Sequence, residues 1–167
     1  PLTLLLGGAK IDSKIDLIDY FIGVADNILI GGGMAFTLLT AKGFEVGNSL
    51  VDQSKISIAT ELIEKAKAKN NLMLPKDSIC ARSLDPTKAK KAYHVSKMPK
   101  NMTGLDIGPK TTEFFSSIIN QSKTVIWNGP LGMFENKDFC EGTHKLAECL
   151  AQNTEKGLIS IAGGGDT

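Results

Sequence analysis

Arginine is almost absent from this chain. Among its 19 lysine and arginine residues, Arg82 is the only arginine, and 18 acidic residues leave a net charge of +1. A nucleic-acid-binding protein needs a clear basic excess, so this balance argues against that class. No apolar run approaches the roughly 18 residues of a membrane-spanning helix. We therefore expect neither nucleic acid nor a membrane among its partners.

Cysteine is also sparse. Cys80, Cys140 and Cys149 are odd in number and form no C-x-x-C pair, so we interpret them as small, buried or half-buried thiols of a reducing compartment rather than as metal ligands. No signal peptide is recognisable, and we expect a cytoplasmic location. Because the chain opens with Pro1 before an apolar segment and stops inside a glycine-rich run, we expect it to be a piece of a longer protein.

Short apolar runs alternate with segments of helical spacing. Each apolar run ends at glycine or proline and has the length of a strand buried on both faces. This order predicts one α/β domain with an open, mainly parallel, Rossmann-like sheet and helices on both faces, a three-layer arrangement. The predicted strands are 2–6, 28–30, 72–74, 125–127 and 158–162, the predicted helices lie within 11–25, 34–41, 56–66, 111–121 and 143–153, and candidate short strands lie at 79–81 and 93–95.

Glycine gathers after the predicted strands. Ten of the 17 glycines fall in four clusters, at 7–8, 31–33, 129 with 132, and 163–165. In an open α/β sheet such turns lie together beyond the carboxyl ends of the strands, where ligands bind. Glycine lets a ligand approach backbone N–H groups, and helix N-termini favour phosphate. Tight turns alone are the alternative, but four clusters at one edge favour a phosphate-bearing ligand.

Charged residues stand close to these glycines. Lys10 follows the first cluster, and Lys14 lies four residues on, a spacing at which like charges repel by roughly a few tenths of a kcal/mol. A bound polyphosphate would relieve this repulsion, whereas two solvated lysines are the plainer alternative. Asp166 follows the last cluster, where its carboxylate either caps a helix or holds Mg²⁺. The residues alone leave both pairs of alternatives open.

Two common nucleotide motifs do not account for the glycines. The chain has no G-x-x-x-x-G-K-[ST] sequence, which excludes a P-loop. The best match to G-x-G-x-x-G is 31–36, where Phe36 replaces the final glycine. An NAD-dependent oxidoreductase is therefore a weak alternative.

Five short sequences, in this order and rough spacing, resemble phosphoglycerate kinase. Each is weak alone, but the ordered set is very specific and covers essentially the whole chain. The similarity is to the family's C-terminal, nucleotide-binding domain. The five are Gly7-Gly8-Ala9-Lys10 with Lys14, Gly31 to Phe36, Leu105 to Pro109, Trp127 to Pro130 with Phe134-Glu135, and Gly163 to Thr167.

The resemblance implies that residues 1–167 are an incomplete C-terminal domain, with the N-terminal substrate domain and the C-terminal tail absent. It implies phosphoryl transfer between 1,3-bisphosphoglycerate and ADP, giving 3-phosphoglycerate and ATP, in glycolysis or gluconeogenesis. This chain would supply the Mg-ADP or Mg-ATP site and be inactive alone, while the triose would bind to the absent domain of a full-length monomer. The alternative is a stand-alone nucleotide-binding module without catalysis.

The resemblance also implies roles for single residues. Lys10 would contact the transferring phosphoryl group, and Gly165 is the second residue expected to be catalytic. Lys14 would contact the nucleotide phosphates, Asp166 would hold Mg²⁺, and Glu135 would accept hydrogen bonds from the ribose. The adenine slot would be lined by Gly31, Gly32, Gly33, Leu105 and Met133, phosphate would be received by Gly164, Gly165 and Thr167, and the nucleotide site would also include Gly8, Ala9 and Asn128.

This sequence departs from the family pattern at a few positions. Ser13 stands where the family more often has an acid, and Leu131 and Met133 occupy positions usually filled by smaller valines. Neither change threatens nucleotide binding. The family's N-terminal domain carries the arginine-containing site for the acidic triose, and Arg82 alone cannot replace it.

Overall fold

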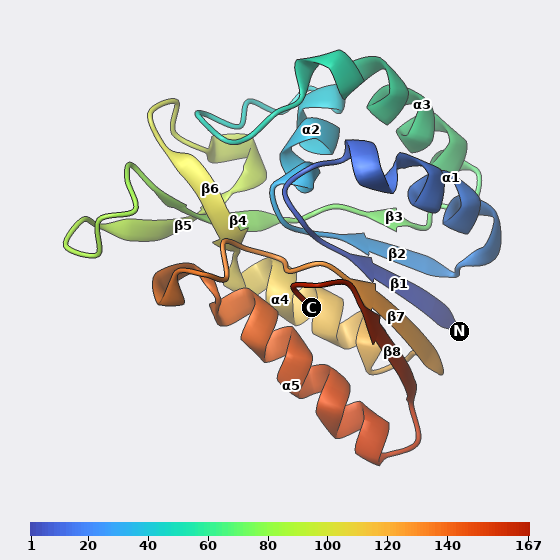
Figure 1. Ribbon diagram of the computed structural model, residues 1–167. Helices are drawn as coiled ribbons and strands as arrows, with labels where there is room; N and C mark the ends of the chain where they lie inside the picture. Colours follow the sequence, from blue (N-terminus) through green and yellow to red (C-terminus); the bar gives the residue numbers. More distant parts are fainter.

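The computed structural model describes all residues from 1 to 167 and contains two sheets (Figure 1). The main sheet has the order β3-β2-β1-β7-β8, and all neighbouring strands in it are parallel. The predicted parallel sheet is therefore confirmed, and all of its strands fall where apolar runs predict them. They are β1 (Leu2–Leu6), β2 (Asn27–Ile30), β3 (Leu72–Met73), β7 (Thr124–Asn128) and β8 (Ile159–Gly163).

Helices cover both faces of the main sheet (Figure 1). Side chains alternate along a strand, so Leu4 and Leu6 of β1 enter one core while Leu5 enters the other. The first core contains residues of α1 (Ile15–Val24), α2 (Met34–Ala41) and α3 (Ile56–Lys67), and the second contains residues of α4 (Pro109–Ile119) and α5 (Glu141–Glu155). The predicted three-layer arrangement is confirmed.

The predicted helices differ from the structure mainly at their ends. The apolar spacing predicts a helix from Ile11, but a 3-10 turn, η1 (Asp12–Lys14), precedes α1. Ile11 is still buried in the first core, which explains why the spacing extends to it. Three further 3-10 turns are η2 (Gln53–Lys55), η3 (Val95–Lys97) and η4 (Lys137–Phe139).

The second sheet is antiparallel and is only partly visible in the sequence. Its central strand β4 (Asp77–Ala81) pairs with β5 (Lys90–His94) and β6 (Thr103–Ile107). The sequence pattern does not predict β6, because Gly104 and Asp106 are poor strand formers. A Cβ on Gly104 would lie 2.2 Å from the ring of Phe36 in α2. Packing against α2 therefore requires glycine inside this strand.

The remaining expectations from composition concern thiols and membrane segments. All three cysteines are free, with Cys80 and Cys140 buried and Cys149 half-buried, as expected. Burial raises the pKa of the Cys80 thiol to about 11, so it stays protonated at neutral pH. No helix has both the length and the apolar character that crossing a membrane requires.

Candidate functional site

The glycine clusters lie together at one edge of the main sheet. They follow β1, β2, β7 and β8, which are neighbours in the parallel order. The carboxyl ends of parallel strands point to the same edge, which is where open α/β sheets bind ligands. The structure therefore brings the four turns into one surface, as the sequence predicts.

Some of these glycines are required by close backbone contacts. A Cβ on Gly7 would lie 2.0 Å from the carbonyl oxygen of Pro130, and one on Gly32 would lie 2.6 Å from that of Gly8. The N–H groups of Gly8 and Gly32 donate to the carbonyls of Pro130 and Leu131 over 2.8 and 3.0 Å. Close backbone contacts therefore account for glycine at positions 7 and 32. The amides of Gly7, Gly8 and Gly32 are used within the fold, so only other glycines have amides left for a ligand.

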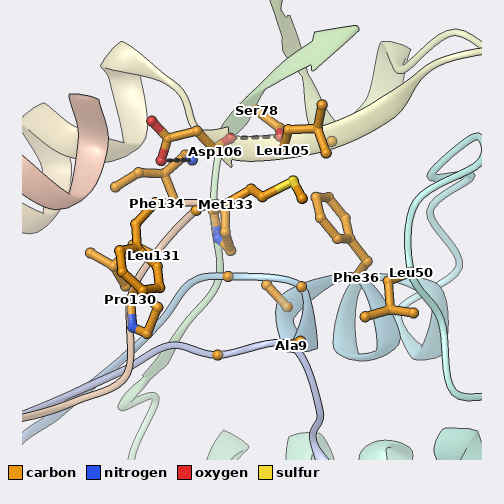
Figure 2. A pocket seen from close by; sticks show the side chains of 18 of the residues that line it. Ala9, Phe36, Leu50, Ser78, Leu105, Asp106, Pro130, Leu131, Met133 and Phe134 are labelled. Atoms are coloured by element: carbon orange, nitrogen blue, oxygen red, sulfur yellow. Dashed lines mark hydrogen bonds between the residues drawn. The ribbon is translucent and has the colours of Figure 1, made fainter. Parts of the chain in front are cut away.

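A cleft of about 360 Å³ opens between these turns and the second sheet. Its lining is largely apolar at one end, where Phe36 and Met133 point toward one another (Figure 2). Leu50 and Met133 are 53% and 38% exposed, so this end is open to solvent at its mouth. An apolar slot of this size suits a ligand with an aromatic ring. We call this part of the cleft the apolar end.

Hydrogen bonds fix the wall of the apolar end. The N–H of Met133 donates to the carbonyl of Leu105 over 2.7 Å and ties the loop 129–140 to β6. The Ser78 hydroxyl on β4 donates to the carbonyl of Asp106 over 2.8 Å (Figure 2). The wall is therefore held in place by bonds that need no ligand.

Asp106 places a buried carboxyl group in this wall. It is 4% exposed, its Oδ1 accepts from the N–H of Ile107 over 2.8 Å, and its Oδ2 accepts from the N–H of Gly142 over 2.9 Å. Burial raises the pKa of Asp106 to about 7, while the two amide hydrogen bonds oppose this shift. Nearby Glu141 also raises it, and Lys90 lowers it.

A second buried carboxylate, Asp77, lies nearby on β4. Its Oδ1 accepts from the N–H and the hydroxyl of Thr111 over 2.8 and 2.7 Å, and its Oδ2 accepts from the N–H of Lys110 over 3.0 Å. These donors belong to the first turn of α4, where N–H groups lack partners within the helix. Asp77 therefore caps α4 and joins it to the second sheet.

The opposite end of the site is polar and exposed. Lys14 Nζ donates to Oδ1 of Asn128 at the end of β7. The hydroxyl of Thr167 accepts the N–H of the turn after β7 over 2.8 Å. Lys10 is exposed, and the N–H groups of 164–165 make no hydrogen bond. Cations and free amides at strand ends are groups that bind phosphate, and we call this part the polar end.

The structure divides the residues that the resemblance singles out. Gly31 lies behind Leu131, because a Cβ there would be 2.5 Å from Leu131 Cδ2, and it does not line the cleft. Those that line the cleft are Gly8, Ala9, Gly32, Gly33, Leu105, Met133, Glu135 and Asp166. Those beyond it, at or after the same strand ends, are Lys10, Lys14, Asn128, Gly164, Gly165 and Thr167.

Sequence reasoning misses other lining residues. Phe36 stands out only as the residue that breaks the G-x-G-x-x-G pattern, and Leu50 lies in a loop without a recognisable signal. Ser78, Thr103 and Asp106 belong to the second sheet. A prediction of β6 from the stretch Leu105 to Pro109 would have pointed to Asp106, since that stretch is one of the five family sequences.

Comparison with known proteins assigns the family. A sequence model of phosphoglycerate kinase matches residues 1–167. The chain belongs to the phosphoglycerate kinase family. The phosphoglycerate kinases of Prosthecochloris aestuarii and Thermosipho africanus are 46% and 43% identical to it over 100% of the chain. The structure of phosphoglycerate kinase from Coxiella burnetii matches 99% of the chain with a TM-score of 0.92 at 35% identity.

These relatives are longer than the chain. It spans 42% of the length of the two curated phosphoglycerate kinases and 42% of the Coxiella burnetii chain. The likeness in fold extends over nearly all of the chain. The α/β class expected from the sequence is therefore shared with a solved member of the phosphoglycerate kinase family.

Proposed function

We propose that the cleft binds an adenine nucleotide, with the adenosine at the apolar end and the phosphates at the polar end. The observation that carries this proposal is that an apolar slot and a cationic strand edge adjoin in one site. A nucleotide has the same division, with an aromatic base at one end and a polyphosphate at the other. Glu135 lines the cleft and would accept hydrogen bonds from the ribose hydroxyls.

Residues 1–167 would then be the nucleotide-binding domain of a phosphoglycerate kinase. The complete protein would transfer a phosphoryl group between 1,3-bisphosphoglycerate and ADP, with 3-phosphoglycerate and ATP as products. Such a transfer needs in-line positioning and neutralisation of charge rather than covalent help from the protein. Membership of the family and an exposed lysine edge support this proposal.

The chain's own groups would act on the phosphates. Lys10 would neutralise charge on the transferring phosphoryl group, and the free N–H of Gly165 would donate to it. Lys14, now bonded to Asn128, would turn part of its hydrogen-bonding capacity to the nucleotide, since an ammonium group has three donors. No general base is needed, because the acceptor of the reverse reaction is already a carboxylate.

Mg²⁺ would enter the site together with the nucleotide. No three His, Cys, Asp or Glu side chains converge to hold a metal ion, and Asp166 lines the cleft as a single carboxylate. This donor set fits Mg²⁺, which keeps several waters and binds one or two carboxylates along with substrate phosphates. Asp166 would hold the ion, which would supply neutralising charge to the phosphates.

The triose substrate would bind to a part of the protein outside this chain. Arg82 is exposed, and it lies in the loop between β4 and β5 rather than at the cleft. The chain alone would therefore bind nucleotide without turning it over, and the complete enzyme would be a cytoplasmic monomer.

Calorimetric titration of the chain with Mg-ADP and with NAD tests the proposal. We expect heat of binding for Mg-ADP only. Binding of NAD but not ADP would overturn the proposal in favour of an oxidoreductase.

A coupled kinase assay on the chain and on the product of the complete reading frame tests the proposed inactivity of the chain and the proposed activity of the complete protein. Turnover by the chain alone contradicts its inactivity, and no turnover by either protein supports a nucleotide-binding module without catalysis.

A further inference from the structure

Two buried carboxyl groups, those of Asp77 and Asp106, lie in the lining of the cleft, and the proposed function uses neither. Capping of α4 explains Asp77, whose carboxylate accepts hydrogen bonds from that helix. Asp106 is different, because its two amide donors lie on separate elements, Ile107 on β6 and Gly142 on α5. It joins the strand that lines the cleft to the helix that follows the loop 129–140.

The space around Asp106 is closed by two glycines. A Cβ on Gly132 would lie 2.4 Å from Asp106 Oδ1, and one on Gly142 would lie 2.7 Å from the same atom. A side chain at either position would therefore push the loop or α5 away from β6. The loop and the helix therefore both pack closely against β6 around the carboxyl group of Asp106.

This contact lies next to the groups that face the ligand. Gly132 precedes Met133, and Leu105 precedes Asp106 in β6. Met133 and Leu105 are joined by the 2.7 Å main-chain hydrogen bond, and both line the cleft. A movement of α5 away from β6 would therefore displace the two residues that we assign to adenosine. The N-terminus of α5 also favours a negative charge at this point.

We propose that Asp106 is a positioning residue whose ionised carboxylate holds α5 and the loop 129–140 against β6 and thereby places Met133 and Leu105 for adenosine. This positioning role rests on the proposed function, because the position of these side chains matters only if a nucleotide binds. Asp106 lies in the wall of the apolar end and not among the residues assigned to the phosphates, so its loss should affect one end of the site.

Ionisation makes this role sensitive to pH. The charged groups around the carboxylate are Glu141 at the start of α5, Lys90 on β5 and Lys145 on α5, the last of which lines a small hollow beside it. With a pKa of about 7, Asp106 gains a proton near neutral pH. A protonated carboxyl group accepts less strongly from the two amides. Adenosine binding is therefore expected to weaken as pH falls from 8 to 6.

The test compares the wild-type product of the complete reading frame with D106N. Asparagine keeps the shape of the side chain but turns one acceptor oxygen into a donor that opposes an amide N–H. Affinity is measured by NMR titration with adenosine, which has no titrating phosphate, and with inorganic tripolyphosphate. We expect D106N to bind adenosine about tenfold more weakly at pH 8, the effect of one lost charge-assisted hydrogen bond. We expect unchanged binding of tripolyphosphate.

Leu150→Ala is the control for stability. Leu150 is buried between α5 and the main sheet but does not line the cleft. Its truncation should lower the stability of the protein and leave adenosine affinity unchanged. Equal weakening by L150A and D106N would show a merely structural effect and overturn the proposal.

The pH profile gives a second, independent readout. We expect wild-type adenosine affinity to fall between pH 8 and pH 6 and D106N to show no such fall. If D106N does not fold, the wild-type profile decides, and a flat profile contradicts the proposal. If the wild type binds ADP and D106N binds adenosine with wild-type affinity, the positioning role alone is refuted. Failure of the wild type to bind ADP, adenosine or tripolyphosphate overturns the proposed function and the positioning role together.

Discussion

The two ends of the site are built in opposite ways. At the apolar end, Leu131 is buried, and hydrogen bonds from Met133 and Ser78 to β6 fix the wall. At the polar end, Lys10 is exposed and the amides of 164–165 have no partner. One end is complete without a ligand, whereas the other consists of donors that a ligand would satisfy.

This difference has a physical cause. An apolar slot needs only shape, and packing with main-chain hydrogen bonds supplies that shape in the folded chain. Phosphate binding needs several positive groups close together, and these repel one another until an anion is present. Such groups therefore remain solvated, which keeps the cost of holding them near one another low. Base binding should thus depend on the fold, and phosphate binding should depend on charge.

The largest expected effect comes from breaking the backbone contact beneath both ends. Gly7→Ala would place a Cβ 2.0 Å from the carbonyl oxygen of Pro130, so β1 and the turn after β7 must separate. We expect a loss of about 4 kcal/mol or more in the free energy of unfolding, measured by urea denaturation. Gly23→Ala in α1 is the matched control. No atom lies within 4 Å of its new Cβ. Because alanine favours a helix more than glycine does, this substitution should raise the free energy of unfolding by about 0.5 kcal/mol.

A second prediction concerns the pH dependence of stability. The folded-state pKa of Asp106, about 7, lies above its ordinary value of 3.8, so the native state holds a proton that the unfolded chain releases first. This proton relieves the penalty of burying a charge, even though it weakens the two amide hydrogen bonds that hold α5. Its stabilising effect is complete below about pH 4 and is lost as pH rises through 7. A shift of this size corresponds to about 4 kcal/mol as an upper bound.

The measurement is urea denaturation of wild type and D106N from pH 4 to 8. The difference between their free energies of unfolding should change across this window, with the wild type losing more stability as pH rises. All other titrating groups are common to both proteins, so the difference isolates Asp106. Parallel profiles would contradict the shifted pKa.

Lys14→Ala tests the polar end. It removes a cation beside Asn128, and we expect Mg-ADP to bind at least about tenfold more weakly, since hydrogen bonds to charged groups contribute about 1.5–3 kcal/mol. Adenosine affinity should stay the same, because the apolar end does not depend on this charge. Lys42→Ala serves as the control, since Lys42 is exposed and lies outside the cleft. A parallel loss of adenosine binding would erase the distinction between the two ends.

Asp166→Ala is expected to have the smallest effect. Mg²⁺ should increase the affinity for ADP about fivefold less in this variant than in the wild type, since one of several oxygen ligands of the ion is lost. Binding of ADP in EDTA should be unchanged. Isothermal titration with and without Mg²⁺ measures this, and Asp85→Ala, in the exposed loop between β4 and β5, is the control. Unchanged Mg²⁺ dependence would support the alternative that Asp166 has only a local structural role.

The parts of the molecule that follow from periodicity could be predicted. The strands of the main sheet lie in short apolar runs that end at glycine or, after β3, at proline, and β1 and β2 show this most clearly. In the second sheet, the candidate strands 79–81 and 93–95 overlap β4 and β5, but β6 could not be predicted, because it contains Gly104 and Asp106, which are chosen by their contacts with Phe36 and α5. Long-range contacts outweigh local preference at both positions.

The sequence by itself determined the layered α/β fold, the shared edge of the glycine turns and the charged residues near it, because alternation and spacing act locally along the chain. Only the tertiary structure decided which glycine amides are free, that Gly31 lies behind Leu131, and that the cleft is completed by Phe36 and the second sheet. The tertiary structure also decided the protonation behaviour of Asp106. Burial and two amides from different elements set its pKa, and neither exists until the chain has folded.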